Sequence, residues 1–156
     1  MDLAGPSILA LYLALKGAAY VWWCARGVRR FRPERAGSRA LALGLGGARL
    51  ALGAVFGVAI FLLGALVYER LSESAALDAT AVTVLTYLAV YVPVRWIEWA
   101  IIEAALTPRS RGLAGFVLGP DAGARVWRLG GALISCLADM PLMFAVGGLP
   151  VGRFMC

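Results

Sequence analysis

The chain has 156 residues, of which 62% are hydrophobic and 15% are charged, and its formal net charge is +6. Soluble domains are typically about 45–50% apolar and about 25% charged, so this composition excludes an ordinary water-soluble domain and a disordered chain. Histidine is absent and the three cysteines are far apart in the sequence, which removes most haem, zinc and imidazole-base chemistry. We therefore expect no cofactor and no metal.

The apolar stretches predict four transmembrane helices. About 20 apolar residues make one membrane-crossing helix, so a chain of this size holds four spans with short loops. The predicted spans cover residues 5–25, 41–68, 79–106 and 129–150. The expected fold class is an all-α integral membrane protein, in which residues 1–156 form a single domain, an antiparallel four-helix bundle.

The first apolar stretch, residues 5–25, is interpreted as a retained span. No Lys or Arg precedes the stretch, and Trp22 and Trp23 stand near its end where a signal peptide would have a small-residue cleavage site. A loop interrupted by Pro33 follows and carries six arginines, which are Arg26, Arg29, Arg30, Arg32, Arg35 and Arg39. Arginine-rich short loops stay in the cytoplasm, and tryptophan pairs anchor helices at the membrane interface.

The second predicted span is interrupted by Arg49, which leaves two interpretations open. Either the helix begins near Leu50, or a longer, tilted helix keeps Arg49 at the inner boundary by snorkelling. The connection at residues 69–78 has three acidic residues against one arginine and is predicted to lie outside. The third span ends at Thr107 and Pro108, which form a helix stop signal.

The connection at residues 107–128 is predicted to be cytoplasmic, and its apolar middle, residues 112–118, is expected to lie on the membrane surface. It has one aspartate, Asp121, against four arginines, which are Arg109, Arg111, Arg125 and Arg128. The two inner loops thus hold ten arginines, whereas the outer loop and the termini hold only Arg70 and Arg153. This asymmetry predicts a cytoplasmic (inner) membrane protein with both termini outside, and it favours a membrane over a nucleic acid as partner.

Six ionisable side chains lie inside or at the edge of the predicted spans, and we expect them to form an intramembrane charge network. They are Lys16, Arg49, Arg95, Glu98, Glu103 and Asp139. A charge at the centre of a membrane helix costs roughly 2.5–3.5 kcal/mol on insertion scales, so these charges should face one another or a wet cavity. Lys16 and Asp139 lie at similar depth and are predicted to pair, whereas the other four share a layer nearer the cytoplasm.

The third span carries a polar stripe, because polar side chains recur at steps of three and four residues. Its members are Thr80, Thr83, Tyr87, Tyr91, Arg95 and Glu98. The stripe is expected to point into the bundle, either as structural contacts between helices or as the lining of a solute or proton path. Glu103 is displaced around the helix toward the loop arginines. A similar stripe on the first span comprises Tyr12, Lys16, Tyr20 and Trp23.

No catalytic motif is found in the sequence, so an enzyme is the less favoured class. The serines have no nearby base, and phosphate loops and dinucleotide fingerprints are absent. We expect a non-catalytic multi-pass membrane protein, an accessory, anchoring or regulatory subunit with the lipid bilayer and homo- or hetero-oligomeric membrane proteins as partners. The alternative is a small oligomeric transporter or channel in which Lys16, Asp139, Arg95 and Glu98 line a path. A lipid-modifying enzyme with Glu98 or Asp139 as base ranks third.

Overall fold

The computed structural model describes residues 4–73, 76–107 and 112–145, and these residues form helices and connections with no strand. The all-helical prediction is therefore confirmed for the described residues. The long helices are α1 (Ala4–Phe31), α2 (Arg39–Ser72) and α6 (Ala122–Ala145). Helix α3 (Ala79–Thr86), the π-helical turn η2 (Tyr87–Tyr91) and helix α4 (Val92–Leu106) follow one another without a break. We call this continuous unit the Ala79–Leu106 rod. Two short elements are also present, the 3₁₀ turn η1 (Pro33–Arg35) and helix α5 (Leu113–Leu118).

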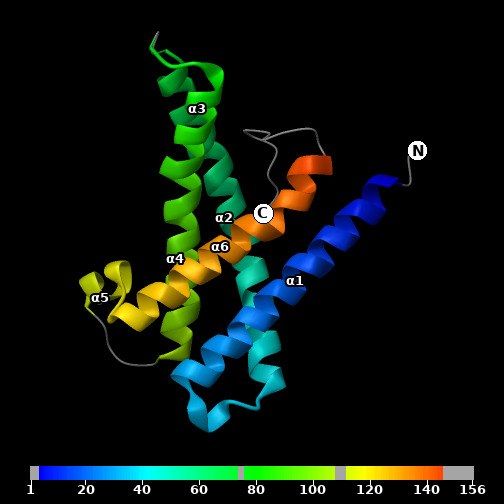
Figure 1. Ribbon diagram of the computed structural model, residues 1–156, viewed down its shortest axis with the longest axis vertical. Coiled ribbons are helices and arrows are strands. Elements are labelled where there is room, and N and C mark those ends of the chain that lie inside the picture. The colour runs from blue at the N-terminus through cyan, green and yellow to red at the C-terminus, as the bar shows by residue number, and fades with distance from the viewer. Residues whose placement is uncertain (1–3, 74–75, 108–111, 146–156) are drawn as a thin grey trace.

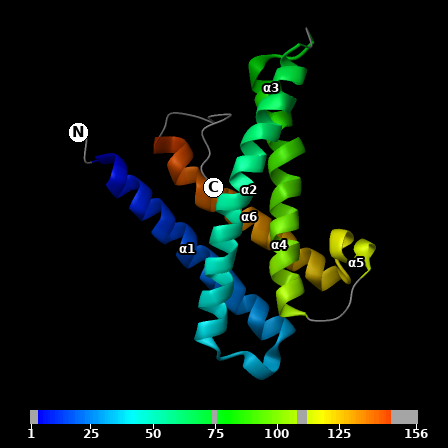
Figure 2. The ribbon, with the colours of Figure 1, turned by 180° about the vertical axis from the view of Figure 1, so that it is seen from behind.

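Two of the described helical segments, α2 and the Ala79–Leu106 rod, are long and apolar enough to cross a membrane. They lie side by side and antiparallel along the long axis of the molecule (Figures 1 and 2). Helix α1 packs on α2, and α6 packs on both α1 and α4. Both α1 and α6 cross this pair obliquely, so that α3 packs on α2 and stands away from α1 and α6 (Figures 1 and 2).

Local sequence signals explain where the helices begin and bend. The side chain of Ser38 accepts a hydrogen bond from the Leu41 amide at the start of α2, and Asp78 does the same for the Ala81 amide at the start of α3. Such caps satisfy amide groups that have no partner inside the helix. Pro93 has no amide hydrogen to donate back along the helix, and the π-helical turn lies directly before it.

Several helices are longer than the spans predicted from the sequence. Helix α1 continues to Phe31, so Arg26, Arg29 and Arg30 lie on a helix, as do Arg125 and Arg128 at the start of α6. Arginine is a good helix former, so a helix continues after the apolar sequence has ended. The loop arginines Arg109 and Arg111, the tail residue Arg153 and the end of the fourth predicted span lie outside the described residues.

Of the two interpretations of Arg49, the longer helix is present, whereas the start near Leu50 and the snorkelling of Arg49 are wrong. Helix α2 begins at Arg39, ten residues earlier than Arg49, which excludes a start near Leu50. Arg49 does not snorkel to the boundary either, because its side chain is fully buried between helices. A buried arginine is tolerated here because a carboxylate and two aromatic rings from other helices surround it.

The polarity of the molecule is opposite to that of a water-soluble protein. Large aliphatic side chains such as Val55, Leu62 and Leu137 are more than half exposed. In the described part of the chain seven charged side chains are at most 3% exposed, and they are Lys16, Arg49, Arg95, Glu98, Glu103, Arg128 and Asp139. In water-soluble proteins such residues are almost never fully buried, and the exposed surface carries them.

Helices α1 and α2 approach closely at Gly46. A Cβ atom on this residue would lie 2.5 Å from Cγ2 of Val21 and 3.0 Å from its backbone. Only glycine permits this distance between the two helices. On α6, Gly131 has the same role against the ring of Trp99, where a Cβ atom would lie 2.5 Å from the nearest ring atom.

Candidate functional site

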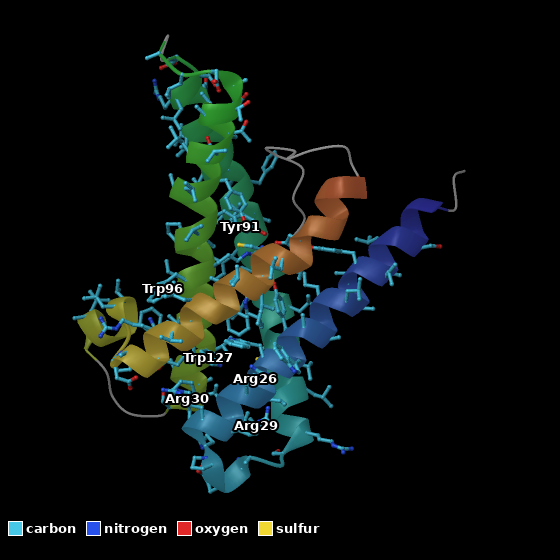
Figure 3. All side chains as sticks on the ribbon, viewed as in Figure 1. Arg26, Arg29, Arg30, Tyr91, Trp96 and Trp127 are labelled. Atoms are coloured by element: carbon cyan, nitrogen blue, oxygen red, sulfur yellow. The ribbon has the colours of Figure 1, made fainter. Side chains whose placement is uncertain are left out.

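Five of the six predicted intramembrane charges form one connected cluster, which we call the central network. It comprises Lys16 of α1, Arg49 of α2, Arg95 and Glu98 of α4, and Asp139 of α6. Tyr91, which precedes α4 and contacts this cluster, lies where α6 crosses the rod (Figure 3). Each long helix therefore contributes at least one charged side chain to the centre of the molecule.

Asp139 accepts hydrogen bonds from four donors among the described residues. Lys16 Nζ and the Tyr12 hydroxyl both donate to Oδ1, the latter over 2.5 Å. The Tyr91 hydroxyl donates to Oδ2, and Arg95 Nη2 lies 3.3 Å from the same oxygen. An ionised carboxylate is an acceptor with about four lone-pair sites, so these four donors occupy it fully.

Arg95 connects the two carboxylates of the central network. Its Nη1 donates to both oxygens of Glu98, over 3.2 and 2.9 Å, while its Nη2 faces Asp139. Arg49 Nη2 donates to the same Glu98 over 2.5 Å and lies 3.3 Å from Ser135 Oγ. Hydrogen bonds and ion pairs thus run without interruption from α1 through α6 and α4 to α2.

Aromatic rings surround the guanidinium group of Arg49. Its central carbon lies 4.7 Å from the ring centre of Tyr20 and 5.1 Å from that of Trp99. Among the described residues, Nε and Nη1 of Arg49 have no hydrogen-bond partner. Attraction between the cation and the ring faces offsets part of this loss, and it is strongest where water is excluded.

The central network holds more positive than negative charge. Three of its side chains are cationic and two are carboxylates, so one positive charge is in excess when all five are ionised. Charges interact strongly in a poorly polarisable interior, so loss of a carboxylate should cost more stability than loss of a cation. The two signs are therefore not interchangeable in this cluster.

Glu103 lies outside the central network, although it was expected to share a layer with Arg49. It pairs with Arg128 of α6, whose Nε lies 2.6 Å from Glu103 Oε2, and both side chains are fully buried. The same arginine donates from Nη1 to the Phe116 carbonyl over 2.6 Å. This second pair joins α4, α5 and α6, and the expected contact of Glu103 with an arginine that follows the third span is present.

The polar stripe is only partly directed into the bundle. Tyr91 is buried in the central network, whereas Tyr87 is half-buried and donates to Cys136 Sγ over 3.0 Å. Thr83 is half-buried and donates to the carbonyl of Ala79 in its own helix, and Thr80 is exposed. The π-helical turn disrupts the regular helical period, and α3 stands away from α1 and α6, so an unbroken stripe could not form.

Tyr12 was expected on the same helix face as Lys16, and Ser135 on the same face as Asp139, but their hydrogen bonds to the central network were not predicted. Each lies four residues before a network residue on the same helix, Tyr12 before Lys16 and Ser135 before Asp139. Residues at this spacing are neighbours on a helix surface, so the spacing indicates the shared face but not the partner on another helix. Arg128 was assigned to the loop before the fourth span, so a contact with Glu103 was expected, but the complete burial of Arg128 was not.

Comparison with known proteins gives no family: no family model matches the chain, and no curated protein or solved structure shows significant similarity to it. Function is therefore inferred from the site itself. In the described part of the chain no group of three or more metal-ligating side chains occurs. Both carboxylates of the central network are occupied by cationic or hydroxyl donors, which is typical of structural ion pairs.

Proposed function

We propose that the protein is a four-span integral membrane protein in which the central network holds the spans together. It acts as a non-catalytic accessory, anchoring or regulatory subunit of a membrane complex. The observation that carries this proposal is the burial of five mutually paired charged side chains, each at most 3% exposed, inside a molecule with an aliphatic surface. In a bilayer, charged side chains are tolerated where they face the bundle interior and pair with one another.

Helices α1 and α6 are included as spans because their outward faces are apolar. Leu11 and Leu15 on α1, and Leu133 and Leu137 on α6, are at least 50% exposed. Each of these helices carries one charged residue of the central network, which lowers its mean hydropathy although that residue faces inward. Lipid would contact the leucine faces, whereas the charged groups remain inside the protein.

The arrangement of the ends supports a topology with both termini outside. The arginine-rich end of α1, the turn η1 and helix α5 lie toward one end of the molecule, and the α2–α3 connection lies at the other (Figure 1). The first turns of α1 and the last turns of α6 point away from the arginine-rich end (Figures 1 and 2). Under the positive-inside rule the arginine-rich end is cytoplasmic.

A subunit role is supported by the two-helix projection, which we define as residues 60–72 of α2 together with α3. It extends beyond α1 and α6 (Figures 1 and 2), and its outer surface is apolar. The exposed residues include Phe61, Leu62, Leu66, Val84 and Leu85. Among the described residues no third helix packs beside this pair, so it offers a continuous surface along which a helix of another membrane protein can pack.

Exchange of Glu98 for Gln tests the structural role of the network. Glu98→Gln leaves Arg49 and Arg95 without their shared carboxylate, so the free energy of unfolding in detergent should fall by roughly 3–5 kcal/mol. The amount of partner protein that copurifies in mild detergent should also be lower for this variant than for the wild type. Glu73→Gln is the matched control, because the side chain of Glu73 is 62% exposed at the α2–α3 connection and its exchange should change neither quantity.

Reconstitution distinguishes this proposal from a transporter. Purified wild-type protein in liposomes should support no proton or solute flux without a partner. Flux by the wild type that disappears in a stably folded Glu98→Gln variant would establish the transporter instead, because an amide keeps the shape of the side chain and cannot exchange a proton. A stable variant with unchanged partners would contradict the structural role.

A further inference from the structure

An apolar groove lies between the end of α1 and the start of α2. Its volume is about 250 Å³, and its lining includes Val21, Ala25, Val28, Arg39, Ala42 and Leu43. The residues from Val21 to Val28 follow α1 for about 10 Å at the helical rise of 1.5 Å per residue. The groove is therefore lined mainly by aliphatic side chains, and its lining includes residues of the η1–α2 connection.

Small residues in the η1–α2 connection keep this groove open. Gly37 belongs to its lining, and a Cβ atom on this glycine would meet no atom within 4 Å. Ala36 and Ala42 line it as well. A larger side chain at position 37 would therefore have room, and it would occupy space that is otherwise available to a ligand.

Positive charge gathers at the part of the groove that the η1–α2 connection lines. Arg39 lines the groove and is exposed, and Arg35 at the end of η1 is also exposed. Helix α2 begins here, with Ser38 as its cap, and the start of a helix carries partial positive charge. Six arginines stand against one carboxylate, Glu34, between residues 26 and 48. Arg26, Arg29 and Arg30 lie at the same end of the molecule (Figure 3).

We propose that this groove binds an anionic phospholipid, with one acyl chain between α1 and α2 and the phosphate beside Arg39 and Arg35. The aliphatic walls match an acyl chain, and arginine together with a helix start matches a phosphate. The inference rests on the proposed function, since the arginine-rich end must lie at the cytoplasmic interface, where anionic lipids and basic segments attract each other. A phospholipid is favoured over a free phosphate ion as the ligand, because a free phosphate ion would contact only the arginines and would not fill the apolar groove.

Lipid retention by the purified protein tests the inference. Protein in neutral detergent is given phosphatidylglycerol or phosphatidylcholine with identical acyl chains, and bound lipid is measured by native mass spectrometry and by the shift in Tm. One phosphatidylglycerol per chain should be retained with a rise in Tm, because a ligand that binds the folded state stabilises it. Phosphatidylcholine and inorganic phosphate should give a weaker effect. Equal retention of the two lipids would overturn the proposal.

Two pairs of variants locate the lipid. Arg39→Gln should weaken phosphatidylglycerol binding about tenfold, whereas Arg29→Gln, which removes an exposed arginine outside the groove lining, should not. Gly37→Leu should also weaken binding by filling the groove, whereas Gly47→Leu, at another glycine with open space around its Cβ position, should not. Equal effects of the two arginine variants with no effect of Gly37→Leu would indicate unspecific surface charge and overturn the proposal.

The same preparation separates this inference from the proposed function. A protein that stays monodisperse without detergent would contradict the membrane assignment, whatever lipids it retains. A protein that requires detergent and has the proposed topology, but retains no phosphatidylglycerol, would contradict only the lipid site.

Discussion

At the residue scale, the excess positive charge of the central network predicts unequal effects of two exchanges. Asp139→Asn leaves three cations with one carboxylate, whereas Lys16→Met leaves two of each sign. We expect Asp139→Asn to lower the free energy of unfolding by roughly 3–5 kcal/mol. Lys16→Met should lower it by roughly 1–2 kcal/mol, mainly through lost hydrogen bonds. Unfolding in detergent measures both values.

The matched controls are Glu34→Gln and Arg29→Met, because both residues are exposed and their exchange should change the stability little. If Lys16→Met and Asp139→Asn lowered the free energy of unfolding equally, this result would contradict an excess of positive charge in the central network. The contact between Arg95 and Asp139 also limits rescue in the double variant Lys16→Met/Asp139→Leu, since both arginines then share Glu98 alone. That variant should recover only part of the stability lost in Asp139→Asn.

At the element scale, the close approach of α1 and α2 predicts opposite effects at two adjacent glycines. Gly46→Ala places a methyl group 3.0 Å from the backbone of Val21, so the helices must separate and stability should fall by roughly 1–3 kcal/mol. Gly47→Ala meets no atom within 4 Å, so it should keep the gain of about 1 kcal/mol that alanine has over glycine in a helix.

Thermal unfolding in one detergent compares the two alanine variants directly. Because both changes have the same intrinsic helix propensity, their difference reports the contact with α1 alone. A stabilising Gly46→Ala variant would show that α1 and α2 are farther apart than the structure places them.

Prediction at the element scale succeeded where the signal is local. Residues 79–106 were expected as one helix, and the Ala79–Leu106 rod has these bounds. The Asp78 cap and the Thr107–Pro108 stop are both readable from a few neighbouring residues. Apolar length misjudged the other ends, because α1 and α6 continue through sequence that contains several arginines, and α2 continues through Glu69 and Arg70; such sequence is helical without being apolar.

At the scale of the whole molecule, the proposed topology predicts which connections are accessible from outside. Cys24 is fully buried and cannot report the side of the membrane, and Cys156 lies outside the described residues. In a Cys156→Ser background, Ser72→Cys should react with an impermeant maleimide in right-side-out vesicles. Ala36→Cys should react only after the vesicles are opened. Both positions are exposed, Ala36 just before the start of α2 and Ser72 at its last residue, so they lie at opposite ends of this helix.

The reverse labelling pattern would contradict the orientation with both termini outside. Labelling of both positions in sealed vesicles would contradict the span formed by α2. A double variant with both cysteines is the internal control, because one preparation then reports the two ends under the same conditions.

The sequence by itself determined the helical class, the apolar segments and the set of charged residues that lie among them. These properties follow from composition, helix propensity and short-range periodicity, which depend on residues close together in the chain. The similar depth of Lys16 and Asp139 was sufficient to predict that these two residues meet, because depth along a span is counted directly from the sequence.

Only the tertiary structure decided how the remaining charges are shared. Arg95 faces both Glu98 and Asp139, Arg49 enters between two aromatic rings, and Glu103 turns to Arg128. These choices depend on the angle at which α1 and α6 cross the α2–α4 pair and on the π-helical turn before Pro93. Crossing geometry arises from packing between residues far apart in the chain, so the spacing of residues along one helix cannot determine it.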